Sequence, residues 1–271
     1  MKKIFFCLSF IIISFVALSQ NKEITLEGIY KDYNFYPKSY QGLKSMNNGE
    51  FYTQMKRTED GQEIIKYNFK NGDRITRLFK SSDFKIGRIN SYTLSHDDKL
   101  MILATDTESI YRYSKRAIYY VFNIHNNKLK KISEEKIRYP TFCPNSEKIA
   151  FVYNNNLYIK NILNGKETQI TFDGKKNHII NGASDWVYEE EFRLVKGFEW
   201  SSNGEIIAYY KFDESHVKEF SMDKFNGNLY PTQEVFKYPK AGEANSTVNV
   251  YLYNLNKKEK SLIYTEEDYE Y

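Results

Sequence analysis

The chain has 271 residues and is only slightly basic, with a formal net charge of +4. Lys and Arg alternate with Asp and Glu along most of its length, and no basic stripe or basic amphipathic helix stands out. This distribution argues against a protein that binds nucleic acid or a membrane surface. Aromatic residues make up 17% of the chain, with 24 Tyr, 19 Phe and only 5 Pro, a composition that favours β-sheet.

The first residues have the pattern of an export signal. Lys2 and Lys3 precede an almost unbroken apolar run from Ile4 to Leu18, and small residues follow as a cleavage site requires. The run is shorter than the ~20 residues of a spanning helix. We therefore expect a signal peptide at residues 1–19 and an exported mature chain, periplasmic or extracellular, with an uncleaved membrane anchor as the alternative.

Two short elements alternate along the chain, four times each. The first is a tight turn with Asn or Asp at its third position and an apolar strand after it. Its copies are residues 46–50, 95–99, 143–147 and 201–205. The second is a hairpin turn between two alternating strands. Its copies are residues 67–72, 122–127, 160–165 and 253–258. One copy of each makes about one four-stranded sheet.

Four such sheets, at a spacing near the ~40–50 residues of propeller blades, predict an all-β chain: a partial β-propeller of about four four-stranded blades. An open β-solenoid or a pair of sandwiches fits this spacing less well. The fourth unit is stretched by inserted loops, and such inserts often carry the binding site of a repeat protein. Propellers close with ~4–8 blades, and four is the rare minimum. Since no returning strand that could close the ring follows the fourth hairpin, we expect this chain to be the front part of a longer polypeptide.

The sharpest local feature of the insert is Asp185-Trp-Val-Tyr-Glu-Glu-Glu-Phe192. Ser184 or Asp185 can cap a short acidic helix. The side chains expected to anchor it against the sheet are Trp186, Val187 and Phe192. Three adjacent carboxylates repel one another, so they need either solvent or a compensating cation. A protonated amine has three donors and suits such a set of acceptors. A solvated helix face is the alternative, and spacing alone favours it.

Other candidates for chemistry are few. Arg112, just after the second inner strand, could bond a carbonyl or carboxylate, although a lone arginine there is more often an ion-pairing surface residue. The four histidines lack metal-ligand spacing, so we expect no metal and no other cofactor. The segment Gly182-Ala-Ser-Asp-Trp186 fails the nucleophile-elbow pattern at its last position, and we expect no catalytic residue in this chain.

Three stretches of the chain match the motifs of one family. They are the double-glutamate segment 185–192, the run from Trp200 through Gly204 to Tyr209, and the segment 238–248 with its Tyr-Pro-Lys-Ala-Gly core. Weaker likeness extends over nearly all of residues 20–271, including Ile24-Thr25-Leu26. On these residues the chain resembles the N-terminal propeller region of the dipeptidyl peptidase IV family of serine peptidases.

The resemblance implies a substrate and a site. Members of this family release dipeptides from peptide N-termini and prefer Pro or Ala at the second residue. Two neighbouring glutamates on a short propeller helix hold the free α-amine, and by position these are Glu190 and Glu191, with Glu189 as their outer neighbour. A propeller arginine of the family binds a substrate carbonyl, and Arg112 matches it. Peptides with a blocked terminus are expected to be rejected.

The resemblance also implies what lies elsewhere. The family's Ser-Asp-His triad belongs to a C-terminal α/β-hydrolase domain that is absent here, so this chain alone should be inactive. Residues 20–271 correspond to the first half of a propeller of about eight blades. The family forms homodimers through an arm, so Lys211–Tyr238 is expected to contact a partner.

The leading interpretation is the substrate-gating propeller portion of an exported serine dipeptidyl peptidase. A non-catalytic peptide-binding propeller or inactive homologue is the second. An unrelated propeller scaffold, with its three glutamates merely solvated, is the third.

Overall fold

A computed structural model describes residues 23–37 and 42–263, and the expected signal peptide lies outside these ranges. The chain divides into two units, Met1–Gln41 and Gly42–Tyr271. In the first unit, helix α2 (Leu26–Tyr30) begins after Thr25, whose hydroxyl accepts a hydrogen bond from the N–H of Gly28 at 2.9 Å. None of the helices in the described ranges is long and apolar enough to cross a membrane.

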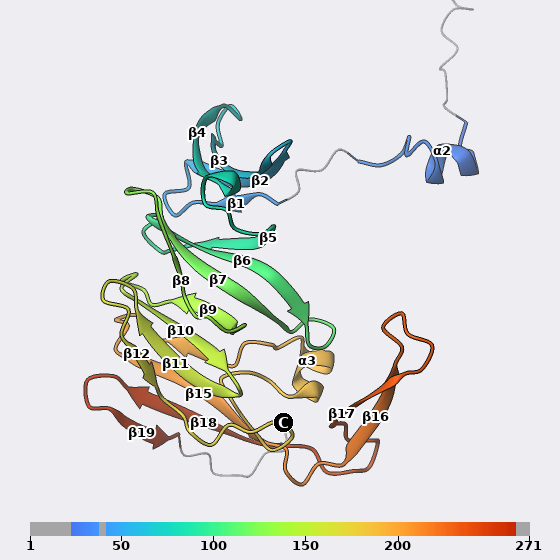
Figure 1. Ribbon diagram of the computed structural model, residues 1–271, viewed down its shortest axis with the longest axis vertical. Coiled ribbons are helices and arrows are strands. Elements are labelled where there is room, and N and C mark those ends of the chain that lie inside the picture. Colours follow the sequence, from blue (N-terminus) through green and yellow to red (C-terminus); the bar gives the residue numbers. More distant parts are fainter. Residues whose placement is uncertain (1–22, 38–41, 264–271) are drawn as a thin grey trace, which may run out of the picture. The chain divides into compact units, whose positions relative to one another are not determined.

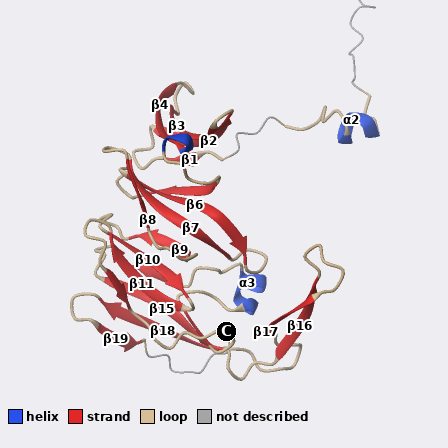
Figure 2. Cartoon of the chain, in the orientation of Figure 1, coloured by secondary structure: helices blue, strands red, loops and turns tan. Residues whose placement is uncertain are grey.

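The second unit is a series of antiparallel sheets (Figures 1 and 2). The first sheet contains β1 (Lys44–Ser45), β2 (Phe51–Thr58), β3 (Gly61–Asn68) and β4 (Arg74–Lys80), after which η1 (Ser81–Asp83) forms a 3₁₀ turn. The second contains β5 (Ile89–Leu94), β6 (Leu100–Ser109), β7 (Lys115–Asn123) and β8 (Lys128–Lys131). The third contains β9 (Arg138–Phe142), β10 (Lys148–Tyr153), β11 (Asn156–Asn161) and β12 (Glu167–Gln169). In each sheet the strands are neighbours in the order in which they follow in the chain.

The fourth sheet has five strands rather than the expected four. They are β13 (Ile179–Asn181), β14 (Phe198–Trp200), β15 (Ile206–Asp213), β18 (Thr247–Asn254) and β19 (Glu259–Leu262). Helix α3 (Trp186–Phe192) lies between β13 and β14, and a separate hairpin of β16 (Glu219–Lys224) and β17 (Thr232–Lys237) lies between β15 and β18. The extra strand arises because α3 interrupts the strand that pairs with β15, so β13 covers one end of β15 and β14 the other.

Both repeated elements occur where the sequence predicts them. The tight turns join the first and second strands of the sheets, with β14 as the first strand of the fourth. Their fourth residues all take positive φ, between 57° and 70°: Gly49, Asp98, Ser146 and Gly204. The second repeat forms the hairpin turn before the last strand of each sheet. These turns are local in sequence, which is why their pattern reveals the sheets.

The core consists of layers between consecutive sheets. Ile64 and Phe79 of the first sheet pack with Met101 and Phe122 of the second. Two further clusters join the second sheet to the third and the third to the fourth. Residues 100–105 of β6 are therefore all buried, whereas an antiparallel sheet with one wet face would alternate. The result is an all-β partial propeller of four blade-like sheets, with a short acidic helix inserted in the fourth.

Candidate functional site

Two chain segments, which together we call the neck, connect helix α3 to strands β13 and β14 of the fourth sheet. Ala183 and Lys196 form an antiparallel bridge across the neck, and the N–H of Gly197 donates to the carbonyl of Gly182 at 3.0 Å. Gly182 has a φ of +73°, a conformation that L side chains rarely adopt. A Cβ atom on Gly197 would meet the backbone of Ala183 at 3.1 Å. The two glycines thus let the two strands of the neck approach closely.

The helix begins at Asp185, as the sequence predicts. One carboxylate oxygen accepts from the N–H of Tyr188 at 2.9 Å, and the other accepts from the Ser246 hydroxyl at 2.7 Å. Asp185 is only 4% exposed, and burial raises the pKa of its carboxyl group. Ser246 belongs to the motif at 238–248, so two of the segments that resemble the family are in contact at the start of α3.

The aromatic anchors of α3 differ in part from the expected ones. Val187 is buried and Trp186 packs on Tyr238, with ring centroids 4.4 Å apart. Phe192 was expected to anchor the helix against the sheet but is 56% exposed at the end of the helix, where its ring contacts that of Tyr188. Tyr188 is the anchor instead, with its ring edge-on to Phe212 at 4.8 Å.

The three adjacent glutamates have three different environments, since each residue is turned by about 100° from the last. Glu189 is fully buried, and its Oε1 accepts from the N–H groups of Tyr113 at 2.7 Å and Ser114 at 2.8 Å. The side chain of Glu190 is 14% exposed, and Glu191 is exposed. Glu189, the expected outer neighbour of the pair, is thus the most buried of the three. Two backbone N–H groups bond its Oε1, whereas its buried Oε2 has no hydrogen-bond partner among the described residues.

Arg112 lies directly against α3. Its Nε is 2.8 Å from Oε2 of Glu190, and 68% of its side chain remains exposed. Arg112 belongs to residues 110–114, the loop that joins β6 to β7. This loop is closed by a hydrogen bond from the N–H of Ile110 to the carbonyl of Ser114 at 2.9 Å. The structure thus brings Arg112 and Glu190 together, with Glu191 next to them on the exposed side of the helix.

A cavity of about 840 Å³ lies in the same unit, and Tyr111, Arg138, Ser184, Glu214 and Phe236 are among the residues that line it. Glu214 is 6% exposed, and burial raises its pKa to about 7, with a further contribution from the carboxylate of Asp185. Burial and the Glu214 carboxylate also raise the pKa of Tyr111. One acid near the candidate site therefore changes its charge around neutral pH.

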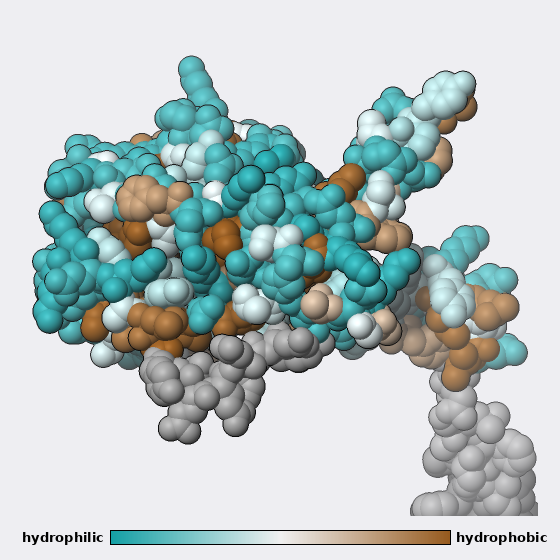
Figure 3. All heavy atoms as spheres, turned by 90° about the horizontal axis from the view of Figure 1, so that it is seen from below, coloured by the Kyte–Doolittle hydropathy of each residue, from teal (hydrophilic) through white to brown (hydrophobic). Residues whose placement is uncertain are grey.

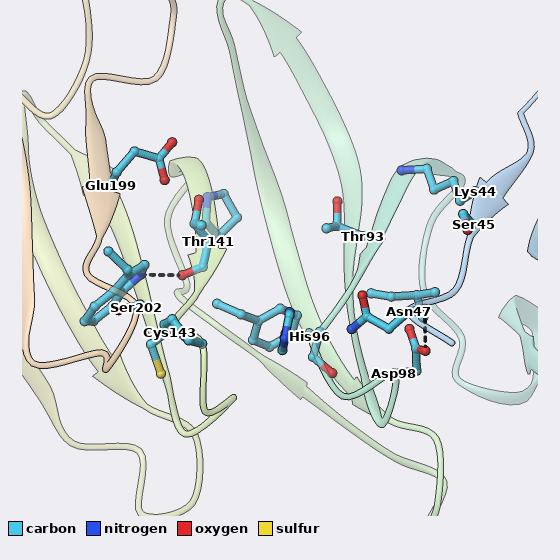
Figure 4. A pocket seen from close by; sticks show the side chains of 16 residues that line it. Lys44, Ser45, Asn47, Thr93, His96, Asp98, Thr141, Cys143, Glu199 and Ser202 are labelled. Atoms are coloured by element: carbon cyan, nitrogen blue, oxygen red, sulfur yellow. Dashed lines mark hydrogen bonds between the residues drawn. The ribbon is translucent and has the colours of Figure 1, made fainter. Parts of the chain in front are cut away.

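A second hollow, of about 770 Å³, is formed where the first strands of the sheets end (Figure 4). Asn47, His96, Cys143 and Ser202 come from its four turns. The hydrogen bonds drawn in Figure 4 lie between residues of this chain. The Nε1 of Trp200 donates to the carbonyl of Thr141, and the N–H of Asn47 donates to the carboxylate of Asp98. Among residues 23–37 and 42–263, no group of three or more His, Cys, Asp or Glu could hold a metal ion.

The fold and the site together define a class: a series of propeller blades, one of which carries an acidic helix beside an arginine. A family model described as the dipeptidyl peptidase IV (DPP IV) N-terminal region matches residues 95–270, and the chain belongs to this family. Family membership removes the unrelated propeller scaffold from the interpretations above.

Three similar proteins illustrate the range of this family. Human prolyl endopeptidase FAP is 30% identical over 230 residues, which cover 84% of this chain and 29% of the human protein. Rat inactive dipeptidyl peptidase 10 is 30% identical over 202 residues, 72% of this chain and 25% of the rat protein. The crystal structure of Porphyromonas gingivalis dipeptidyl peptidase 4 matches with a TM-score of 0.81 and 36% identity, over 92% of this chain and 36% of that one. This chain thus spans a minor part of each relative.

Sequence reasoning missed three features around this site. It did not identify the contact between Glu189 and the 110–114 loop, the bond between Asp185 and Ser246, or the burial of Glu214. A one-residue step along the helix separates Glu189 from Glu190 and decides which of them is buried. The rotation of α3 against the second sheet determines which of the two is buried, and no local sequence signal encodes that rotation.

Proposed function

We propose that α3 and the 110–114 loop hold the protonated α-amine of a peptide, and that the chain is the substrate-gating part of an exported serine dipeptidyl peptidase. The peptidase would release X-Pro and X-Ala dipeptides from free N-termini. The observation that carries this proposal is the pairing of Arg112 with Glu190 beside the exposed Glu191. A cationic donor and two anionic acceptors stand next to each other on one surface.

The chemistry of a peptide N-terminus complements this arrangement. Its ammonium group has three donors, which the carboxylates of Glu190 and Glu191 can accept. The first peptide carbonyl is an acceptor for the guanidinium of Arg112. Charge-assisted hydrogen bonds of this kind contribute ~1.5–3 kcal/mol each when shielded from water. An acylated terminus carries no charge and would leave the two carboxylates without a cation.

The test replaces Glu190 and Glu191 singly by Gln in the complete gene product. The measurement is the release of p-nitroaniline from glycyl-prolyl-p-nitroanilide. Loss of one charge-assisted bond should lower kcat/KM roughly 10- to 100-fold for each variant. Glu199→Gln is the matched control, because Glu199 is an exposed acid on β14 whose carboxylate pairs with Lys196. Undiminished turnover in both site variants would refute the amine-holding role.

A non-catalytic peptide-binding propeller is the alternative. The relatives named prolyl endopeptidase and inactive dipeptidyl peptidase are equally similar to this chain, at 30% identity, so identity does not decide between them. Calorimetry with glycyl-proline amide and its N-acetyl form separates the two functions. Binding of the free amine without any turnover by the complete gene product would favour the alternative.

We also propose that the complete protein is exported and forms a homodimer through the arm. The basic and apolar start of the sequence supports export. Exposed apolar side chains on the β16–β17 hairpin support a partner surface. Cell fractionation tests the first statement, and cytoplasmic retention would contradict it. Sedimentation velocity tests the second, and a monomer at micromolar concentration would contradict it.

A further inference from the structure

Glu189 is the fully buried member of the three adjacent glutamates, so solvent does not compensate its carboxylate. Its Oε1 accepts two consecutive backbone N–H groups, those of Tyr113 and Ser114, at 2.7 and 2.8 Å. Hydrogen bonds to an ionised acceptor are about twice as strong as neutral ones. Helix α3 of the fourth sheet is thereby fastened to the end of the β6–β7 hairpin in the second sheet.

These two bonds act on the backbone directly beside Arg112. Tyr113, the next residue, donates to Glu189 itself. Ser114 is 0% exposed, and its hydroxyl accepts a hydrogen bond of 3.2 Å from the N–H of Tyr111, the residue before Arg112. Glu189 is therefore hydrogen-bonded directly to the backbone on one side of Arg112 and linked through Ser114 to the backbone on the other side.

The ion pair between Arg112 and Glu190 is not enough by itself to hold the Arg112 side chain in one conformation. The Arg112 side chain is 68% exposed, and an ion pair with one exposed partner contributes little because its attraction is offset by the entropy of holding a long side chain. A rigid backbone beneath the arginine lowers that entropic cost, as preorganisation does in binding sites generally.

We propose that Glu189 is the positioning residue of the amine site. It latches the 110–114 loop to α3, so that Arg112 stays aligned with Glu190, and it does not touch the peptide. The inference rests on the proposed function in that Arg112 and Glu190 are taken as the peptide-binding groups. The latch itself is a separate property of the fold.

The first test is a double-mutant cycle in the complete gene product, with Glu189→Ala, Arg112→Ala and both together. If Glu189 acts through Arg112, the single Glu189 variant raises KM for glycyl-prolyl-p-nitroanilide about tenfold, the order expected for coupled neighbours. Its kcat stays nearly unchanged, and the double variant is no worse than Arg112→Ala. Additive losses would overturn the proposal, because a direct peptide ligand or general damage to the fold adds to the loss of Arg112.

Conservative variants keep the inference testable if Glu189→Ala folds poorly. Glu189→Gln keeps an acceptor oxygen but removes the charge, so it should show a smaller rise in KM of the same kind. Glu189→Asp keeps the charge on a side chain one methylene shorter and should resemble Glu189→Ala. The positioning role would also be wrong if Glu189→Gln raised KM as much as Glu189→Ala and if its effect added fully to that of Glu190→Gln.

The second test does not depend on activity. Hydrogen exchange of residues 110–114 should be faster in Glu189→Gln than in the wild type and unchanged in the control Glu191→Gln. If Glu190→Gln and Glu191→Gln leave turnover intact, the proposed function fails, yet the exchange rates still decide whether the latch exists. Equal exchange in all variants would eliminate the latch.

Discussion

Two insertions distinguish the fourth sheet from the other three, and they are built in opposite ways. The α3 insertion buries charge: Asp185 is 4% exposed and Glu189 is not exposed at all. The β16–β17 hairpin exposes apolar surface instead, and every residue of β16 is exposed. Its large exposed side chains, with exposed fractions from 36% to 85%, are Phe220, Met222, Phe225, Leu229, Tyr230 and Val235. Figure 3 shows this hairpin projecting from the rest of the unit with apolar patches on it.

The difference indicates what each insertion is for. A buried carboxylate is tolerated only when specific donors compensate it, and those donors fix one geometry. Such an element suits a binding site, where the groups must be in place before the ligand arrives. Exposed apolar side chains do nothing for the stability of the isolated chain. They gain free energy only when another surface covers them.

The two insertions meet at one place, the base of the hairpin. Phe236 of β17 is 5% exposed, and its ring centroid lies 5.7 Å from that of Tyr111 and 6.5 Å from that of Trp186. The base of the hairpin is thus packed against the candidate site while its far end is exposed. Changes at the site should alter stability, and changes at the end of the hairpin should not.

The largest expected effect is at Glu214. Its pKa of about 7 lies above the ordinary value of 4.5, because burial and the Asp185 carboxylate disfavour the charged form. The folded chain thus binds a proton that the unfolded chain releases between pH 4.5 and 7, so this group costs stability as pH rises through that range. Glu214→Gln should match the wild type below pH 4.5 and exceed it above pH 7, by about 3 kcal/mol at most.

Urea unfolding from pH 4 to pH 8, followed by circular dichroism, measures this difference. The exposed Glu205 supplies the control variant Glu205→Gln, in which the same substitution removes no buried acid. A Glu214→Gln gain that does not change with pH would mean that the carboxyl group does not titrate in this range. It would also weaken the contrast between the two insertions, since the contrast depends on the cost of buried charge.

The next largest effect is at Asp185. Asp185→Ala removes the N-cap of α3 and leaves the buried Ser246 hydroxyl without its acceptor, so unfolding should become easier by about 2 kcal/mol. Asp185→Asn keeps one acceptor for the cap, and its NH₂ can donate to the hydroxyl, so its loss should be smaller. Thermal unfolding measures both. If Ala and Asn destabilise equally, the cap geometry is not what holds the helix.

The sequence predicts those parts of the molecule whose hydrogen bonds are local. The turn ending in Gly204 closes on Ser201, and the cap of α3 closes on Tyr188, three residues from Asp185. Arg112 and Glu190 could be assigned to one site only through the family resemblance, because they lie in different sheets. The burial of Glu189 depends on a contact with Ser114, 75 residues away, and on the angular position of one helix residue. Local sequence patterns encode neither this long-range contact nor the rotation of the helix.

The smallest expected effect on stability is at the far end of the hairpin. Leu229 and Tyr230 are 85% and 80% exposed, so replacing both by Ser should change the free energy of unfolding by less than ~0.5 kcal/mol. If this end contacts a second copy, the same variant should dissociate at concentrations where the wild type is dimeric. Sedimentation velocity over a dilution series measures the change.

Leu163→Ser provides the matched control, because Leu163 is 79% exposed in the turn between β11 and β12, away from both insertions. It should leave stability and oligomeric state unchanged. If the hairpin variant instead loses about as much stability as Asp185→Ala, the exposed side chains support the fold of the chain itself. The contrast between a preorganised site and a surface that awaits a partner would then be wrong, because both insertions would contribute to the same folded unit.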